Sequence, residues 1–362
     1  MRLIPGGAKQ YVKGVVNDLV LDPIIDQIRL LNDRYDQLQE LYQEILVRLD
    51  GAADSSHEPH FLTCHQNLRD LDLALVSLTS YADYARYMED MNKEHNRRRL
   101  VESGLIPDAK MFVVPGFCYV CRRHTRFKVS LDELGFQEEG QLTPNWREHL
   151  ICPRCQLSNR MRASLHILEQ VCGPTPETAI YITEQITDFF RVLSRRYSHL
   201  IGSEFLGQRV PLGTTDDQGV RNEDITHLSF DSGALDIILS FEVLEHVPDY
   251  RQAVRECWRC LKPGGRLLLS APFTWEPRTT IRARLNPDGS VTHLLPPEYH
   301  GDPLSSSGCL CFTHFGWELL DDLRGAGFEH PRALHYWSLE FGYLGYPNQV
   351  CFLAYKPLSA AS

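Results

Sequence analysis

Two pairs of cysteines have a spacing that could hold a metal ion. Each pair is a C-x2-C motif, and residues 122 to 151 separate the first pair from the second. Two such pairs can supply four thiolates to a tetrahedral Zn²⁺. A closed site of this kind stabilises a small module and leaves no position open for a substrate. The predicted ligands of a structural zinc ion are Cys118, Cys121, Cys152 and Cys155.

Acidic and histidine side chains follow an apolar run further along the chain. Residues 237–239 suit a buried parallel strand, and Glu242, Glu245 and His246 come shortly after it. A helical pattern and a second apolar run, 267–269, come next, which predicts a strand–helix–strand crossover in a parallel sheet with helices on its faces. Ligands bind outside the carboxyl ends of such strands, where we expect these three side chains.

A third group of polar side chains lies in residues 274–312, which contain few periodic signals. Their aromatic and histidine content argues for a functional segment rather than a disordered one. A histidine beside a carboxylate can take a proton from an attacking oxygen or nitrogen near neutral pH. The alternative is a structural network within a lid. The candidates for a general base or a substrate clamp are His246, His293, Glu298, His300 and Asp302.

The elements that position these residues divide the chain into three parts. Residues 1–108 carry heptad-like apolar spacing from Ile24 and again from Phe61 to Ala85. This spacing predicts a helical hairpin, or a coiled coil that joins copies of the chain. Residues 109–157 are expected to form a zinc-ribbon-like module. Residues 158–357 predict an α/β domain, with 274–312 inserted over the mouth of its sheet.

The crossover resembles class I S-adenosylmethionine (SAM) dependent methyltransferases, and is most similar to their type 11-like subgroup. Two motifs carry the resemblance, VLEHV at 243–247 and LKPGG at 261–265. With the flanking elements, it covers somewhat more than half of the chain. It implies a Rossmann-like seven-stranded fold and methyl transfer from SAM to an oxygen or nitrogen atom. We expect a small-molecule or saccharide-like acceptor.

The resemblance also implies where SAM binds. An acid ends the first strand of the family's sheet, a second acid takes the ribose hydroxyls, and a third strand with its turn, here 221–225, lies beneath the adenine. Hydrogen-bond acceptors after the fourth strand complete the floor of the SAM site. The residues at these positions are Glu184, Glu204, Asp224, Ile225, Ser240 and Glu242.

The turn after the first strand departs from the family pattern. Glycines there let the backbone approach SAM closely, whereas this chain has Ile186 and Asp188 in their places. The alternative function is therefore a catalytically inactive binding or scaffold protein that keeps the fold and the structural zinc. The acids at Glu184, Glu204, Asp224 and Glu242 argue against that alternative.

Composition and charge limit the class of protein. A net charge of −10 over 362 residues argues against a chain-wide nucleic-acid surface, although basic residues beside the cysteine pairs leave RNA contact as an alternative. No apolar run approaches the roughly 20 residues that span a bilayer, and residues 1–10 lack a signal-peptide core. We expect a cytoplasmic protein without a membrane partner, with eleven cysteines that are free or metal-bound.

Overall fold

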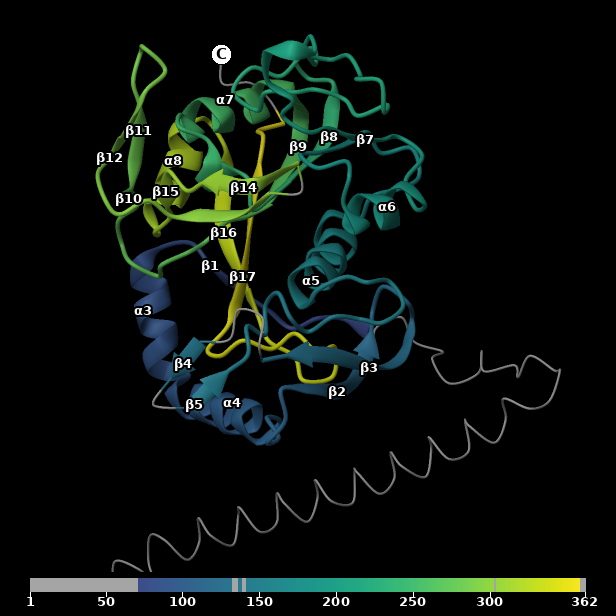
Figure 1. Cartoon of the computed structure of the whole chain (residues 1–362), viewed down its shortest axis with the longest axis vertical. Coiled ribbons are helices and arrows are strands. Elements are labelled where there is room, and N and C mark those ends of the chain that lie inside the picture. The colour runs from purple at the N-terminus through teal and green to yellow at the C-terminus, as the bar shows by residue number, and fades with distance from the viewer. Residues whose placement is uncertain (1–70, 132–135, 139–140, 303, 359–362) are drawn as a thin grey trace, which may run out of the picture. The chain divides into compact units, whose positions relative to one another are not determined.

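The computed structural model describes residues 71–131, 136–138, 141–302 and 304–358 (Figure 1). The chain divides into two compact units, Met1–Asn67 and Leu68–Ser362, and the described residues all belong to the second. The helical pattern expected from Ile24 onward lies outside the described residues.

A seven-stranded sheet forms the centre of the second unit, in the order β1-β16-β17-β9-β8-β6-β7. Strands β7, β6, β8 and β9 are mutually parallel, whereas β17, β16 and β1 continue the sheet in antiparallel pairs. The expected crossover is confirmed, and β16 and β17 form an antiparallel pair. The strands are β1 (Leu75–Leu78), β6 (Ile180–Ile182), β7 (Leu200–Gly202), β8 (Leu235–Phe241), β9 (Leu261–Ser270), β16 (Glu329–Tyr336) and β17 (Gln349–Tyr355).

Helices cover both faces of this sheet, and each face has its own buried cluster. Successive strand residues point to opposite faces, so Ile237 and Leu239 join one cluster while Ile238 joins the other. Helices α5 and α6 contribute to the first cluster, and α7 and α8 contribute to the second (Figure 1). Their bounds are α5 (Asn159–Ile167), α6 (Asp188–Ser194), α7 (Tyr250–Cys260) and α8 (Glu318–Gly325).

The cysteine segment shares the first cluster with the sheet. Strands β2 (Met111–Cys118) and β3 (Arg123–Ser130) form a hairpin, followed by the short pair β4 (Phe136–Glu138) and β5 (Gln141–Thr143). Phe117 and Phe127 are buried together with sheet residues such as Leu353. The segment therefore packs as part of the larger unit and has no separate core of its own.

The helix expected to continue through residue 85 is wrong at 75–78, which form strand β1. These residues pair with β16, and this backbone pairing prevails over the helical spacing of Leu75 and Leu78. Helix α3 (Tyr81–Asp90) begins only after Ser80, whose hydroxyl accepts from the backbone N–H of Asp83. Helix α4 (Asn92–Gly104) follows.

The strand expected at 221–225 is also wrong. Asn222 makes an isolated bridge to Glu204, and the next residues turn away from the sheet. The Asp224 carboxylate accepts from the backbone N–H and the hydroxyl of Thr226, at 2.8 and 2.6 Å. Such a local side-chain bond competes with a strand ladder. The seventh strand of the sheet is instead β1.

The inserted segment has secondary structure of its own, made of short antiparallel pairs. The backbone N–H of Phe312 donates to the carbonyl of Glu245 at 2.7 Å, which ties the insertion to the turn after β8. The paired strands are β10 (Thr280–Ile281) with β15 (Thr313–His314), β11 (Ala283–Leu285) with β12 (Val291–His293), and β13 (Tyr299–Asp302) with β14 (Ser305–Leu310).

None of the described helices combines the length and the apolar composition that crossing a membrane requires. Ten cysteines lie in the described ranges, and all ten are free of disulfide bonds.

Candidate functional site

The four predicted zinc ligands lie together at the tip of the β2–β3 hairpin and in the turn at 152–155. Their sulfur atoms are all within 4.8 Å of one another, with Cys118–Cys155 and Cys121–Cys152 separations of 3.9 Å. Tetrahedral Zn–S bonds place sulfur atoms roughly 3.8 Å apart. Arg122 and Gln156, which directly follow the two pairs, have φ of 53° and 62° and so turn each pair back on itself. The arrangement fits a closed Zn²⁺ site.

The predicted ribose acid, Glu204, lies just beyond β7 and bonds to the turn after β6. One of its carboxylate oxygens accepts from the backbone N–H groups of Gln185 and Ile186, at 2.7 and 3.0 Å. The side chain of Gln185 continues this network, since it donates to the carbonyl of Gly219 and accepts from the N–H of Arg221. The turn that lacks glycines is therefore held by hydrogen bonds to the two neighbouring loops.

Close packing of Gly202 against an aromatic ring also holds this turn in place. A Cβ atom built on Gly202 would lie 2.5 Å from the Phe190 ring and 2.6 Å from the carbonyl oxygen of Glu184, so glycine is required for this close approach. Phe189 is buried in the first cluster, whereas Ile186 is 43% exposed and does not fill the sheet edge.

The other residues assigned to SAM surround the carboxyl ends of β6 and β8. Glu184 is half-buried, and this burial raises the pKa of its carboxyl to about 7. Ser240 is buried and accepts from the Thr183 hydroxyl at 3.4 Å, and Ile225 is buried nearby in the second cluster. Carboxylates at the ends of neighbouring parallel strands are suitable acceptors for hydroxyl and amino groups. These acceptor groups fit the hydroxyl and amino groups of an adenosyl ligand. Glu204 already accepts two hydrogen bonds from the turn.

Glu242 has a different partner from the one expected. Its carboxylate binds the Arg147 guanidinium through two bonds of 2.5 and 3.1 Å and accepts from Ser270 at 2.7 Å. Burial acts to raise the pKa of Glu242, but the Arg147 charge outweighs it and holds the pKa at about 2. Arg147 comes from the cysteine segment, 95 residues earlier, and no local sequence signal pointed to this pair.

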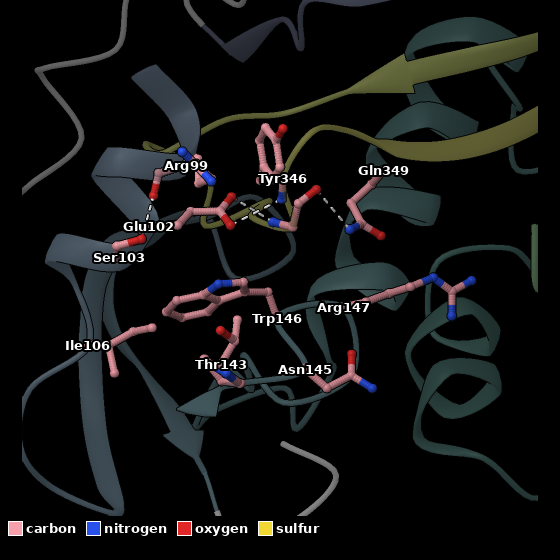
Figure 2. Close-up of a pocket in the computed structure, with 12 residues that line it drawn as sticks. Arg99, Glu102, Ser103, Ile106, Thr143, Asn145, Trp146, Arg147, Tyr346 and Gln349 are labelled. Carbon is pink, nitrogen blue, oxygen red and sulfur yellow. Dashed lines mark hydrogen bonds between the residues drawn. The ribbon is translucent and has the colours of Figure 1, made fainter. Parts of the chain in front are cut away.

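A cavity of about 290 Å³ lies on the other side of Arg147, between α4 and the turns around residues 145 and 346 (Figure 2). Figure 2 shows Trp146 in the middle of its wall, with Arg99 and Glu102 on the α4 side. The indole N–H of Trp146 has no hydrogen-bond partner among the described residues. The Glu102 carboxylate accepts from the backbone N–H groups of Gly345 and Tyr346, so it closes the cavity at that end.

The insertion brings predicted residues together over the turn after β8. Nε2 of His246 and Nδ1 of His300 lie 3.5 and 3.8 Å from the same oxygen of Glu245. The other ring nitrogen of His300, Nε2, forms a hydrogen bond with the Glu298 carboxylate at 2.9 Å. Of the catalytic candidates, His246, Glu298 and His300 therefore form one cluster.

The two remaining candidates lie elsewhere on the insertion. His293 is exposed on β12, and Asp302 lies on β13 with Ser305 as its strand partner. Two residues that were not singled out join the cluster instead. His314 and Arg282 both contact Glu298, at 3.0 and 3.1 Å. The available sequence signal was the position of His314, a histidine just after the insertion.

Part of the sheet domain matches a known protein family. Residues 188–269 match the family model described as a methyltransferase domain. The match covers β7, β8 and α7 and nearly all of β9, and it begins directly after the turn at 184–187. It therefore supports a methyltransferase-type sheet and does not include the turn that lacks glycines.

Curated relatives match the chain over a short stretch. A probable S-adenosylmethionine-dependent methyltransferase of Mycolicibacterium smegmatis is 38% identical over 53 residues, which is 15% of this chain and 21% of that protein. The ubiquinone biosynthesis O-methyltransferase of Xanthomonas oryzae is 51% identical over 39 residues, 11% of this chain and 16% of that protein. The chain thus spans about a fifth of the length of the curated relatives it matches.

Two solved structures of methyltransferases are similar to part of the chain. The 1,6-didemethyltoxoflavin-N1-methyltransferase of Burkholderia thailandensis covers 54% of this chain and 78% of its own, with 17% identity and a TM-score of 0.32. A possible histamine N-methyltransferase of Thermotoga maritima covers 55% of this chain and 90% of its own, with 18% identity and a TM-score of 0.31.

Proposed function

We propose that this protein transfers a methyl group from SAM to an oxygen or nitrogen atom of a small-molecule or saccharide-like acceptor. The observation that carries the proposal is the set of carboxylates at the ends of β6 and β7, beside a segment that matches a methyltransferase domain. Glu184 and Glu204 lie at the edge where open parallel sheets bind their ligands.

The residues around this edge would hold SAM by their acceptor groups. Glu204 suits the ribose hydroxyls, Asp224 and Ile225 suit the adenine, and Ser240 lies in the floor between them. When bound, SAM supplies an electrophilic methyl group on a sulfonium and leaves as a neutral thioether. The acceptor loses its O–H or N–H proton as the new bond to the methyl group forms, so this chain would position the acceptor in line with that methyl and take up the released proton.

The insertion supports acceptor binding on the same side. A cluster lies near the carboxyl end of β8, made of His246 from the turn after that strand and of Glu298 and His300 from the insertion. These groups can clamp a polar acceptor or receive its proton. We keep the base and clamp roles to these three residues.

Binding of SAM is the direct test. Isothermal titration of the full chain with S-adenosylhomocysteine should give a dissociation constant in the micromolar range. Glu204→Gln, which keeps the size of the side chain, should weaken binding about tenfold or more by losing charge-assisted bonds. The exposed Glu177→Gln is the matched control. An absence of heat at high protein concentration would remove the proposal.

We infer that the four cysteines hold one structural Zn²⁺, because their sulfur separations suit tetrahedral coordination. Metal analysis of the purified chain should find zinc, and Cys152→Ser should lower the zinc content by one ion per chain. Unchanged zinc content in that variant would contradict the assignment.

A second function, a binding or scaffold protein without the cofactor, has one observation in its favour. The turn after β6 is already satisfied by Glu204 and by the loop at 219–221. Mass spectrometry of the freshly purified protein separates the two functions. Co-purified SAM or S-adenosylhomocysteine supports the enzyme, whereas protein that carries neither and binds neither on addition supports the scaffold. Pairing of chains through the helical region expected at residues 1–108 is a separate proposal, tested by sedimentation.

A further inference from the structure

We propose that Glu245, His246 and His300 bind one divalent cation at the carboxyl end of β8, in addition to the four-cysteine site. The proposal concerns binding alone and does not depend on methyl transfer. A cation bound here would take the His246 and His300 nitrogens that could otherwise receive a proton, so with it bound these two residues would serve as ligands and not as the base. The three residues come from the turn after β8 and from β13, and the insertion folds back to bring them together.

The distances between the three donor atoms suit a shared ion. The Glu245 oxygen lies 3.5 Å from Nε2 of His246 and 3.8 Å from Nδ1 of His300, and all three atoms lie within 4.8 Å of one another. Donor atoms bound tetrahedrally at 2.0–2.2 Å from one ion are roughly 3.3–3.6 Å apart. Shifts of about half an ångström in the two imidazole rings would complete the coordination.

The hydrogen bonds of the two histidines orient their free nitrogens inward. Nδ1 of His246 bonds to the carbonyl oxygen of Leu310 at 2.9 Å, and a carbonyl can only accept, so this nitrogen carries the proton. Nε2 of His300 likewise donates to the Glu298 carboxylate at 2.9 Å. In each ring the nitrogen without that proton faces Glu245. Histidines that ligate metals are characteristically held through the outer N–H in this way.

A further layer of side chains fixes Glu298, the carboxylate that orients His300. His314 bonds to the same oxygen of Glu298 at 3.0 Å, and Arg282 contacts the other oxygen at 3.1 Å. Glu298 is therefore held from three directions and cannot easily swing into the proposed site. Its role is to orient a ligand, as outer carboxylates do around metal-bound histidines.

Glu245 supplies independent evidence for a cation at this place. Its side chain is completely buried, and within the described ranges neither carboxylate oxygen has a hydrogen-bond partner. A buried carboxylate without hydrogen bonds is costly, and such groups are ordinarily paired or bound to a metal. A cation between Glu245 and the two rings would satisfy it.

The donor set selects the type of ion. Two imidazoles and one carboxylate suit Zn²⁺, Mn²⁺, Fe²⁺ and Co²⁺ better than Ca²⁺ or Mg²⁺, which prefer oxygen ligands throughout. Cys311 lies next to His300, but its thiol donates to the carbonyl of Thr313 and so faces away from this role. Three protein ligands leave coordination positions open, so an oxygen or nitrogen atom from solution can complete them.

The test uses the full chain with its cysteine site occupied by zinc, and Mn²⁺ as the probe. Mn²⁺ is paramagnetic and binds oxygen and nitrogen donors in preference to thiolates. Electron paramagnetic resonance should show one Mn²⁺ bound per chain. His246→Ala and His300→Ala should abolish this binding, and Glu298→Gln should weaken it by about 10- to 100-fold. His293→Ala, on the exposed β12 strand of the same insertion, is the matched control and should bind normally.

Two further measurements keep the result decisive. Retention of zinc by the four cysteines, together with an unchanged circular dichroism spectrum, shows that each variant is folded. Glu245→Gln removes the charge and keeps the shape, so it should lose Mn²⁺ without unfolding the chain. Binding of Mn²⁺, Co²⁺ or a second Zn²⁺ weaker than about 1 mM would overturn the proposal. Equal binding by the wild type, His246→Ala and His300→Ala would overturn it too.

Discussion

The bidentate contact between Arg147 and Glu242 should carry a large part of the attachment of the cysteine segment to the sheet. Replacing Arg147 with methionine keeps most of the side-chain volume and leaves the largely buried Glu242 carboxylate with Ser270 as its remaining side-chain donor. Breaking a buried pair in this way costs about 3–5 kcal/mol of unfolding free energy. Both side chains are about a quarter exposed, so we expect a value near the lower end, ~3 kcal/mol.

The pH dependence gives a related estimate, to which Arg147 contributes together with Arg160 and Ser270. Burial acts to raise the pKa of Glu242, but these three residues lower it from 4.5 to about 2, which corresponds to about 3 kcal/mol at 1.36 kcal/mol per unit. Because the folded-state pKa is depressed, this stabilisation is fully present above pH 4.5 and is lost as the pH falls toward 2. Arg147→Met should therefore be much less stable than the wild type at pH 7, and the difference should shrink at acidic pH.

Urea denaturation, followed by circular dichroism at pH 7 and again near pH 3, measures both effects. The double variant Arg147→Met, Glu242→Gln should recover much of the lost stability, since no buried charge is then left unpaired. Arg195→Met, at an exposed position after α6, is the matched control and should change stability by less than about 0.5 kcal/mol. A loss below about 1 kcal/mol for Arg147→Met, or a loss independent of pH, would refute the reasoning.

Three other outcomes follow from the structure. Gly202→Ala should lower the free energy of unfolding by about 1–3 kcal/mol, because the added Cβ meets Phe190; the double variant with Phe190→Leu should recover part of it in urea titrations. Burial lowers the pKa of His335 to about 3. The free energy of unfolding that the neutral imidazole contributes is therefore complete above pH 6.5 and is lost as the pH falls toward 3. The wild type should lose about 2 kcal/mol between pH 6.5 and 5 through this residue, and His335→Phe should lose correspondingly less, as urea curves at both pH values would reveal. Cys152→Ser should lower the melting temperature measured by calorimetry, because a structural metal contributes folding free energy directly; an unchanged value in metal-containing buffer would count against the zinc assignment.

The sequence by itself determined the parts that depend on local patterns. The crossover from β8 through α7 to β9 was predictable because apolar runs, the helical period and the Pro-Gly break all lie within about forty residues of chain. The two C-x2-C pairs were equally readable, since each knuckle is a local turn, and the structure brings all four sulfur atoms within 4.8 Å of one another. The acidic turn after β8 was readable because it directly follows its apolar run, whereas the acid after β7 was indicated by the family resemblance.

Only the tertiary structure decided which side chains meet across that edge. Arg147 reaches Glu242 across 95 residues, and His300 approaches Glu245 from a hairpin whose path depends on its packing. Pairing with β16 likewise turned 75–78 into a strand, although its apolar spacing also suits a helix. Burial and long-range pairing set these outcomes, because their energies depend on neighbours that no local stretch of sequence contains.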